Sequence, residues 1–395
     1  MTRKTYLWTS IYYTLIFMAG SGLTSYLSLF YEQVRLPDSQ IGLLTSLGAI
    51  VALVSNPFWG VRGDRARTKN RVLAWCLILA AASVWLLPLS GGSFGWLVAA
   101  TIVFFFFQTA VNPLSDSISL ELASRESFPF SKVRTAGSLG YAIMSMVGGW
   151  LIGYHVGTIF LLYSLLILAS LFAFRQLPPV YGHQRNKAKL KFWEVARDRS
   201  LRHMYLYVLV LSAGFGFFFS FHALYSVNQG ISTAWLGVGI MLGSFSQFPF
   251  MLLFDRLYDR FGIRNIILVS GLLNGVRWII YAFWLNAYTL PLLWLMHGGT
   301  YIVLYLCLAE YVHRHVRKEL HASGQMMNAI VLTSAGRIIG GMLGGICAQG
   351  FGYGPVFAAA GILSLGAVAA YWLTTRKASA PMDTPSGLND SGAAL

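Results

Sequence analysis

The sequence predicts an all-α membrane protein with twelve transmembrane helices in two pseudo-symmetric six-helix bundles. Three observations lead to this fold class: an apolar composition, Lys and Arg residues on alternate loops, and an internal repeat. Of the 395 residues, 56% are hydrophobic and only 11% are charged, whereas soluble domains carry about 25% charged residues. A lipid bilayer is therefore the expected main solvent of this chain.

The apolar segments are long enough for membrane spans, since one spanning helix needs about 20 residues. We expect spans at 6–31, 39–60, 71–89, 94–123, 132–154 and 157–175, and at 203–228, 233–255, 265–286, 289–313, 322–349 and 354–375. The basic segment 178–202 is interpreted as a cytoplasmic linker between an N-terminal bundle, 1–177, and a C-terminal bundle, 203–377. The small and polar residues of 378–395 predict a disordered cytoplasmic tail.

Lys and Arg residues set the expected orientation. They gather on alternate loops, including 62–71, 176–202 and 256–264, while the opposite loops hold only Arg35. Cytoplasmic loops carry the excess of positive charge in membrane proteins. We therefore expect a multi-pass protein of the inner cell membrane with both termini in the cytoplasm. The same rule accounts for the net charge of +15, so no nucleic-acid partner is expected.

An internal repeat with an offset of 195 residues divides the chain. The loop GVRGDRARTKNRVL from Gly60 is matched by DRLYDRFGIRNIIL from Asp255. The matched pairs are Gly42 with Gly237, Gly48 with Gly243, Asp64 with Asp259, Arg65 with Arg260, and Asn70 with Asn265. Such a repeat predicts two parallel halves around an axis along the membrane normal.

The repeated loop resembles the signature of the major facilitator superfamily. Gly60, Asp64 and Arg65 carry this conformational motif in the first half, and Asp259 and Arg260 carry it in the second. The segments N-P-L-S-D ending at Asp116, K-V-R ending at Arg134, V-R-W around Arg277, and H-G-G-T from His297 resemble the phenylpropionate permease group. That group is related to oligosaccharide/proton symporters of the lactose permease type. The resemblance implies a secondary active transporter that works by alternating access, without naming its substrate.

Charged side chains within membrane spans are costly and mark candidate functional sites. Asp116 and Arg134 are 18 residues apart across a short hairpin, so antiparallel neighbouring helices can bring them level as an ion pair. The resemblance to lactose permease implies that this pair, with Asn112 nearby, binds substrate. A salt bridge that only holds the two helices together is the other interpretation, and the two interpretations do not exclude each other.

Arg277 and His297 are 20 residues apart in neighbouring spans. The resemblance implies a role for both in proton coupling, with Asp116 as a further carrier, and an imidazole changes its protonation near neutral pH. Two acids of lactose permease are missing, because Thr300 and Ser244 stand at their positions. Galactoside transport by that mechanism is therefore not expected.

The deep ionisable groups have a positive surplus. Asp116 stands against Arg134, Arg277 and Arg337, while Glu121 and Glu310 lie nearer the cytoplasmic ends and are expected to be solvated. Because arginine holds carboxylates bidentately, we expect an anionic substrate such as an aromatic carboxylate. Its site would add Arg277, Arg337 and His222 to the pair. The other interpretation is that one arginine, above all Arg337, snorkels to the cytoplasm.

Proton symport of a small organic anion is thus the predicted function. Within the same superfamily, proton-coupled uptake of a sugar or nucleoside and export of a drug or metabolite are the alternatives. A drug exporter usually has an acid in its first helix, and here none precedes Glu32. A channel is disfavoured because no filter-like segment interrupts the spans.

An enzyme is not expected, because the sequence contains no metalloprotease, nucleophile-elbow or Walker motif. The three cysteines, Cys76, Cys307 and Cys347, are scattered through apolar segments without metal-ligand spacing. We therefore expect neither a cofactor nor a metal. The expected partners are the solute, the proton and the lipid bilayer, and the expected state is a monomer.

Overall fold

A computed structural model describes residues 2–182, 199–317 and 320–376 of the chain. These residues are helical and contain no β-strand, which agrees with the predicted all-α class. Most of the predicted linker, at 183–198, and the predicted tail, 378–395, lie outside the described residues.

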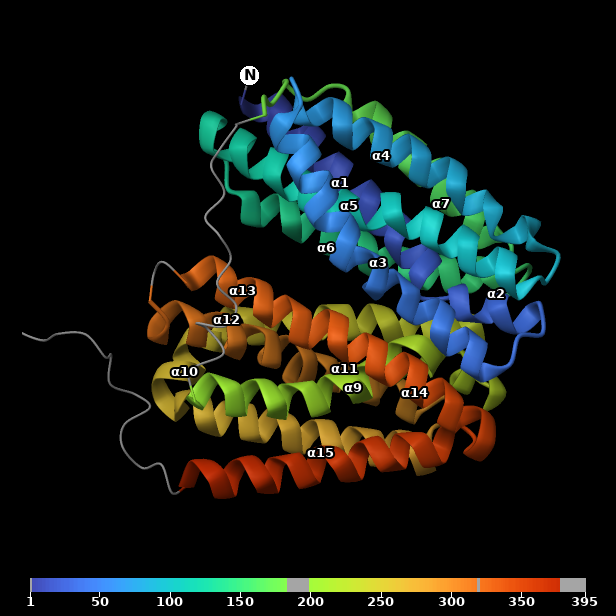
Figure 1. The fold of residues 1–395 in the computed structure, drawn as a ribbon, viewed down its shortest axis with the longest axis vertical. Helices are drawn as coiled ribbons and strands as arrows, with labels where there is room; N and C mark the ends of the chain where they lie inside the picture. Colours follow the sequence, from blue (N-terminus) through green and yellow to red (C-terminus); the bar gives the residue numbers. More distant parts are fainter. Residues whose placement is uncertain (1, 183–198, 318–319, 377–395) are drawn as a thin grey trace, which may run out of the picture.

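The first half of the chain forms one group of helices, the upper group in Figure 1, drawn in blue through teal to green. The elements are α1 (Thr2–Thr24), α2 (Leu27–Gln33), α3 (Asp38–Arg65), α4 (Lys69–Ser83), the short 3₁₀ turns η1 (Val84–Leu86) and η2 (Pro88–Ser90), α5 (Phe94–Glu126), α6 (Phe130–Ile152) and α7 (Thr158–Phe174). The first predicted span is thus α1 and α2 in succession.

The second half forms the other group, drawn in green to red in Figure 1. The elements are α9 (Arg199–Asn228), α10 (Thr233–Trp284), α11 (Thr289–His297), the π-helix η3 (Gly298–Ile302), α12 (Val303–His315), α13 (His321–Ala329), the π-helix η5 (Ile330–Ala335), α14 (Gly336–Phe351) and α15 (Tyr353–Arg376). α10 consists of two helical parts that meet at Gly262, whose φ of 70° and ψ of 154° are not helical. Glycine adopts such a positive φ without a Cβ clash.

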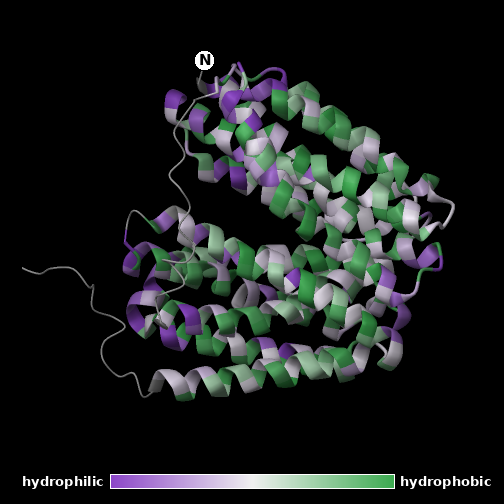
Figure 2. Ribbon diagram, viewed as in Figure 1, coloured by the Kyte–Doolittle hydropathy of each residue, from purple (hydrophilic) through white to green (hydrophobic). Residues whose placement is uncertain are grey.

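Length and composition support a multi-pass membrane protein. Ten helical stretches in the described part of the chain are long and apolar enough to cross a membrane, with α10 counted once, and α7 is a shorter apolar helix. In Figure 2 the hydrophilic residues gather mainly at the ends of the helices. The exact number of twelve spans stays a prediction.

The two halves touch mainly through two helix pairs, α3 with α14 and α6 with α10, and α9 and η5 make smaller contacts with the first half. Glycines make both contacts possible: a Cβ on Gly42 would lie 2.2 Å from the carbonyl oxygen of Gly341, and one on Gly237 would lie 2.4 Å from that of Ser145. Gly42 and Gly237 are a pair of the 195-residue repeat, so the contact itself is repeated. Toward the end that holds the N-terminus, the two halves diverge (Figure 1).

Candidate functional site

The predicted ion pair between Asp116 of α5 and Arg134 of α6 is present. Nη1 of Arg134 lies 2.7 Å from Oδ2 of Asp116. Tyr13 of α1 donates a hydrogen bond of 2.7 Å to the other carboxylate oxygen, Oδ1. Three helices therefore meet at one carboxylate. Sequence reasoning missed Tyr13, because no motif distinguishes it among the 20 tyrosines.

The pair is partly open to solvent. The exposed fraction is 52% for the side chain of Arg134 and 32% for that of Asp116. An ion pair this exposed contributes no more than about 1 kcal/mol to stability, which makes a purely structural role a weak account of it. Asn112, one helical turn before Asp116, is also exposed.

Arg277 and His297 also meet as predicted, in the second half. Arg277 is fully buried. Its Nη1 donates a hydrogen bond of 3.3 Å to Nδ1 of His297 and another of 3.3 Å to Oγ1 of Thr300. Because Nδ1 of His297 accepts this bond, the imidazole is neutral in this arrangement. Thr300, which replaces an acid of lactose permease, is thus a partner of Arg277.

Aromatic rings enclose this arginine. Its guanidinium carbon lies 4.7 Å from the ring centroid of Phe218, 4.8 Å from that of Trp278 and 5.9 Å from that of Trp294. His222 belongs to the same cluster, with its ring 5.4 Å from that of Trp294 and its side chain 3% exposed. Neither Arg277 nor His222 is accessible in this conformation, so their roles in substrate binding stay predictions.

Arg337 is exposed and lies at the contact between the halves. Its guanidinium carbon is 5.4 Å from the ring of Phe219, and its backbone carbonyl accepts a hydrogen bond of 3.2 Å from Ser46 of α3. No ion pair of Arg277 or Arg337 with a carboxylate occurs among residues 2–182, 199–317 and 320–376. The sequence gives the reason, since Asp255, Asp259 and Glu310 are the only acids from 199 to 318 and no acid occurs from 320 to 376.

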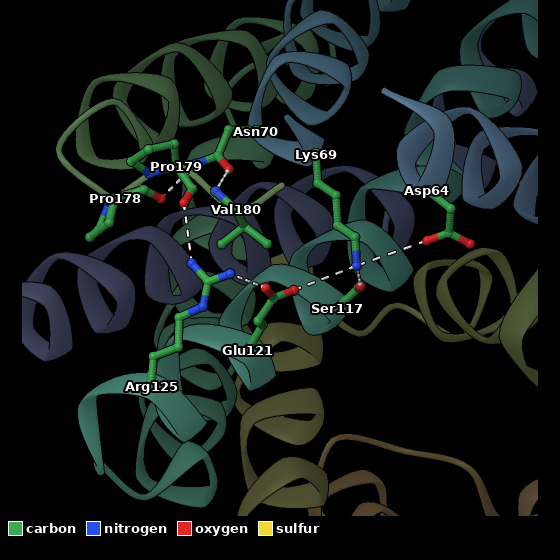
Figure 3. A network of polar contacts seen from close by, with 9 residues as sticks. All are labelled: Asp64, Lys69, Asn70, Ser117, Glu121, Arg125, Pro178, Pro179 and Val180. Atoms are coloured by element: carbon green, nitrogen blue, oxygen red, sulfur yellow. Dashed lines mark hydrogen bonds and ion pairs between the residues drawn. The ribbon is translucent and has the colours of Figure 1, made fainter. Parts of the chain in front are cut away.

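The motif loop of the first half forms a charge network (Figure 3). Nζ of Lys69 lies 3.9 Å from Asp64, 3.7 Å from Glu121 and 3.0 Å from the hydroxyl of Ser117. Arg125, one turn after Glu121, pairs with the same carboxylate. The expectation that Glu121 is simply solvated is therefore wrong, because two cations flank it.

The first residues of the predicted linker belong to this network as well. The side chain of Asn70 donates a hydrogen bond of 3.1 Å to the carbonyl oxygen of Pro178. It also accepts a hydrogen bond of 2.8 Å from the backbone nitrogen of Val180. The backbone nitrogen of Lys69 donates to the carbonyl oxygen of Val180, also over 2.8 Å. Residues 178–180 are thus fastened to the start of α4, as Figure 3 shows.

The second copy of the motif pairs its acid too. Nη1 of Arg314 lies 3.6 Å from Asp259, and Arg314 also pairs with Glu310, so Glu310 is not simply solvated either. The guanidinium of Arg260 lies 5.3 Å from the ring of Phe261, and Arg65 is exposed. No side chain or backbone approaches a Cβ on Gly60 within 4 Å. Gly60 therefore makes no close helix contact in this conformation.

The comparisons with known proteins decide the family. A model of the MFS_1 like family matches residues 6–359. The chain belongs to the major facilitator superfamily. Among characterised and named relatives, the maltose permease of Geobacillus stearothermophilus is 29% identical over 276 residues, which are 69% of this chain and 70% of the permease. The probable 3-phenylpropionic acid transporter of Escherichia coli (strain K12) is 24% identical, with 77% of this chain and 81% of that protein covered.

Solved structures agree on the fold. The crystal structure of the nucleoside transporter NupG superimposes with a TM-score of 0.84 at 17% identity, covering 94% of this chain and 99% of that one. These superfamily members are transporters and permeases rather than enzymes. This chain is accordingly a multi-pass secondary transporter of a small molecule, while the three relatives differ in the solute that their names give.

We expect the change Asp116→Asn to leave the transporter folded, because the pair is exposed and its loss costs about 1 kcal/mol or less. Asparagine is uncharged and can still accept the hydrogen bond from Tyr13. Thermal unfolding of the purified variant checks this. A fall in folded yield, or a destabilisation of several kcal/mol, would instead indicate a structural salt bridge.

Proposed function

We propose that this transporter carries a small organic anion of the aromatic carboxylate class into the cell together with a proton. The observation that carries the proposal is the positive surplus. Asp116 is already paired with Arg134, while Arg277 and Arg337 have no carboxylate partner among the described residues. A solute that brings its own negative charge would complement these arginines.

The substrate would bind first at Arg134 and Arg337, which are exposed on α6 and α14. Both helices contact the opposite half. One ligand would then be bound by Arg134 of the first half and by Arg337 of the second half. Ligand binding would thereby be linked to the relative movement of the two halves. The name of the 3-phenylpropionic acid transporter supports an aromatic acid, whereas the maltose permease supports the alternative of a neutral sugar.

Proton coupling would follow from competition at Arg134. The substrate carboxylate replaces Asp116 as the partner of the guanidinium. Asp116 then loses its counter-charge and takes up a proton from the medium, so that one anion and one proton enter the site together. The hydroxyl of Tyr13, which donates a hydrogen bond to the Asp116 carboxylate, would hold Asp116 in place in both states, because it can also accept a hydrogen bond from the protonated acid. His297 is the other proposed carrier, with Arg277 as its partner.

The orientation is also proposed from the loops. With the basic loops in the cytoplasm of the inner membrane, the end at which the halves diverge in Figure 1 faces the cytoplasm. The conformation described here would then be the inward-open state of a monomeric transporter. Closing the cytoplasmic ends and separating the outer ends would complete alternating access.

Uptake into proteoliposomes tests the proposal. Radiolabelled 3-phenylpropionate, maltose and uridine are offered with the outer buffer more acidic than the lumen. We expect accumulation of the aromatic acid only, and we expect an uncoupler of the proton gradient to stop it. Accumulation of maltose or uridine without the acid would favour the neutral-solute alternative and reject an anion substrate.

A further inference from the structure

The buried side of Arg277 lacks a counter-charge. The side chain is 0% exposed. Its two hydrogen-bond partners, His297 and Thr300, are both neutral acceptors. No Asp or Glu occurs from residue 260 to 309. A guanidinium inside a protein without an opposite charge costs several kcal/mol, so a compensating group is required.

Several hydrogen-bonding atoms beside it have no partner. Nε and Nη2 of Arg277 are buried and unbonded, and both side-chain atoms of Asn274 are in the same condition. Asn274 is also 0% exposed, and it lies three residues before Arg277, on the same face of the helix. Unsatisfied buried polar atoms are rare in proteins and usually mark an ion or water.

The aromatic rings satisfy only part of the requirement. Phe218 and Trp278 present rings 4.7 and 4.8 Å from the guanidinium carbon, and cation–π contacts of this kind stabilise the charge through the ring faces. They leave the in-plane N–H bonds of Nε and Nη2 without an acceptor. Those N–H bonds and the amide N–H bonds of Asn274 therefore need an acceptor, and a negatively charged one would also offset the buried charge of Arg277.

We propose that Arg277 and Asn274 hold a small inorganic anion of the halide class inside the second half. An organic acid does not fit, because the rings around the guanidinium are in contact: the centroid of Phe218 lies 5.1 Å from that of Trp278 and 4.9 Å from that of Trp294. A monatomic anion is smaller than an organic acid and would bind at the in-plane N–H edge of the guanidinium, where Nε and Nη2 lack partners, rather than between the rings. It would neutralise Arg277, so that Arg134 and Arg337 would remain for the proposed anionic solute.

The test is thermal unfolding of the purified full-length protein without solute, in sodium bromide, sodium chloride or sodium gluconate at equal ionic strength. We expect bromide and chloride to raise the midpoint in a saturable manner relative to gluconate. In Arg277→Gln this difference disappears. In Arg175→Gln, which removes an exposed arginine at the end of α7, it remains. Equal midpoints in bromide and gluconate for the unchanged protein would overturn the proposal.

A second variant keeps the proposal testable if Arg277→Gln does not fold. Asn274→Leu keeps the charge and the approximate volume but removes the amide donor. We expect it to weaken the apparent bromide affinity about tenfold or more, the worth of one hydrogen bond to a charged group. An unchanged affinity in this variant would contradict the site.

Anomalous scattering from crystals grown in bromide gives a direct readout. A peak within hydrogen-bonding distance of Nε or Nη2 of Arg277 is expected, and bromide sites confined to the protein surface would overturn the proposal. Because no transported solute is present in either experiment, failure here would leave the proposed anion–proton symport untouched. A failure of that symport would likewise leave the halide site in place.

Discussion

Replacing Arg134 by glutamine is expected to weaken the binding of an aromatic carboxylate about tenfold or more, since a hydrogen bond to a charged group is worth about 1.5–3 kcal/mol. Two effects add. The variant loses the exposed guanidinium, and Asp116 keeps only Tyr13 as a partner, so its charge repels the incoming anion. Isothermal titration of the purified variant with 3-phenylpropionate measures the change.

Two controls separate this effect from a general loss of charge. Arg175→Gln removes an exposed arginine at the end of α7 and should leave the affinity unchanged. Arg337→Gln should weaken the binding of the same ligand, because Arg337 is an exposed arginine on α14, in the opposite half. If Arg134→Gln binds the acid as well as the unchanged protein does, the anion site is not at this pair.

Cross-linking Leu53 of α3 to Ala329 at the end of α13 is expected to abolish transport, and a reductant should restore it. The positions follow from the contact that is closed in this conformation. Gly42 faces Gly341, and Ser46, four residues on, bonds to Arg337, four residues back, so the two helices run antiparallel. Leu53 lies on α3 eleven residues after Gly42, which is about three helical turns.

The partner of Leu53 is then found on the other helix. Eleven residues back from Gly341 lies Ile330, and the π-helical turn of η5 accommodates one extra residue, which brings Ala329 to that place. Both side chains are exposed, with Leu53 at 44%. In a background where Cys76, Cys307 and Cys347 are replaced by serine, Leu53→Cys with Ala329→Cys should form a disulfide when the diverging ends of the two halves close.

A matched pair at the other end provides the control. The backbone nitrogen of Ser39 lies 3.4 Å from Oε1 of Gln349, so Ser39→Cys with Gln349→Cys should form a disulfide in the conformation described here. Each cross-link is followed by gel mobility and by uptake before and after reduction. Unimpaired uptake with the Leu53–Ala329 bond fully formed would contradict closure along this register.

Much of the fold follows from the sequence because the bilayer makes strict demands. Backbone groups in hydrocarbon must bond internally, so apolar stretches become helices, and the predicted ranges agree with α3, α5 and α6 within a few residues. The 195-residue offset also identified Gly42 and Gly237, which are the positions where the halves touch. The family followed from the same loop.

The sequence also located two side-chain pairs, Asp116 with Arg134 and Arg277 with His297, because spacings of 18 and 20 residues can return an antiparallel hairpin to the same level. It did not reveal the contact of Tyr13 with Asp116 or the complete burial of Asn274. Both depend on the rotation of α1 and of the second part of α10 about their axes, which packing decides.

A membrane transporter of this superfamily, with an excess of arginine over acid in its spans, can thus be inferred from the sequence. That Arg134 is exposed while Arg277 is enclosed by Phe218, Trp278 and Trp294 is seen only in the folded chain. The same holds for Glu121, which Lys69 and Arg125 flank. The physical reason is that burial and charge pairing are set by neighbours distant in the chain, and composition carries no information about which neighbours they are.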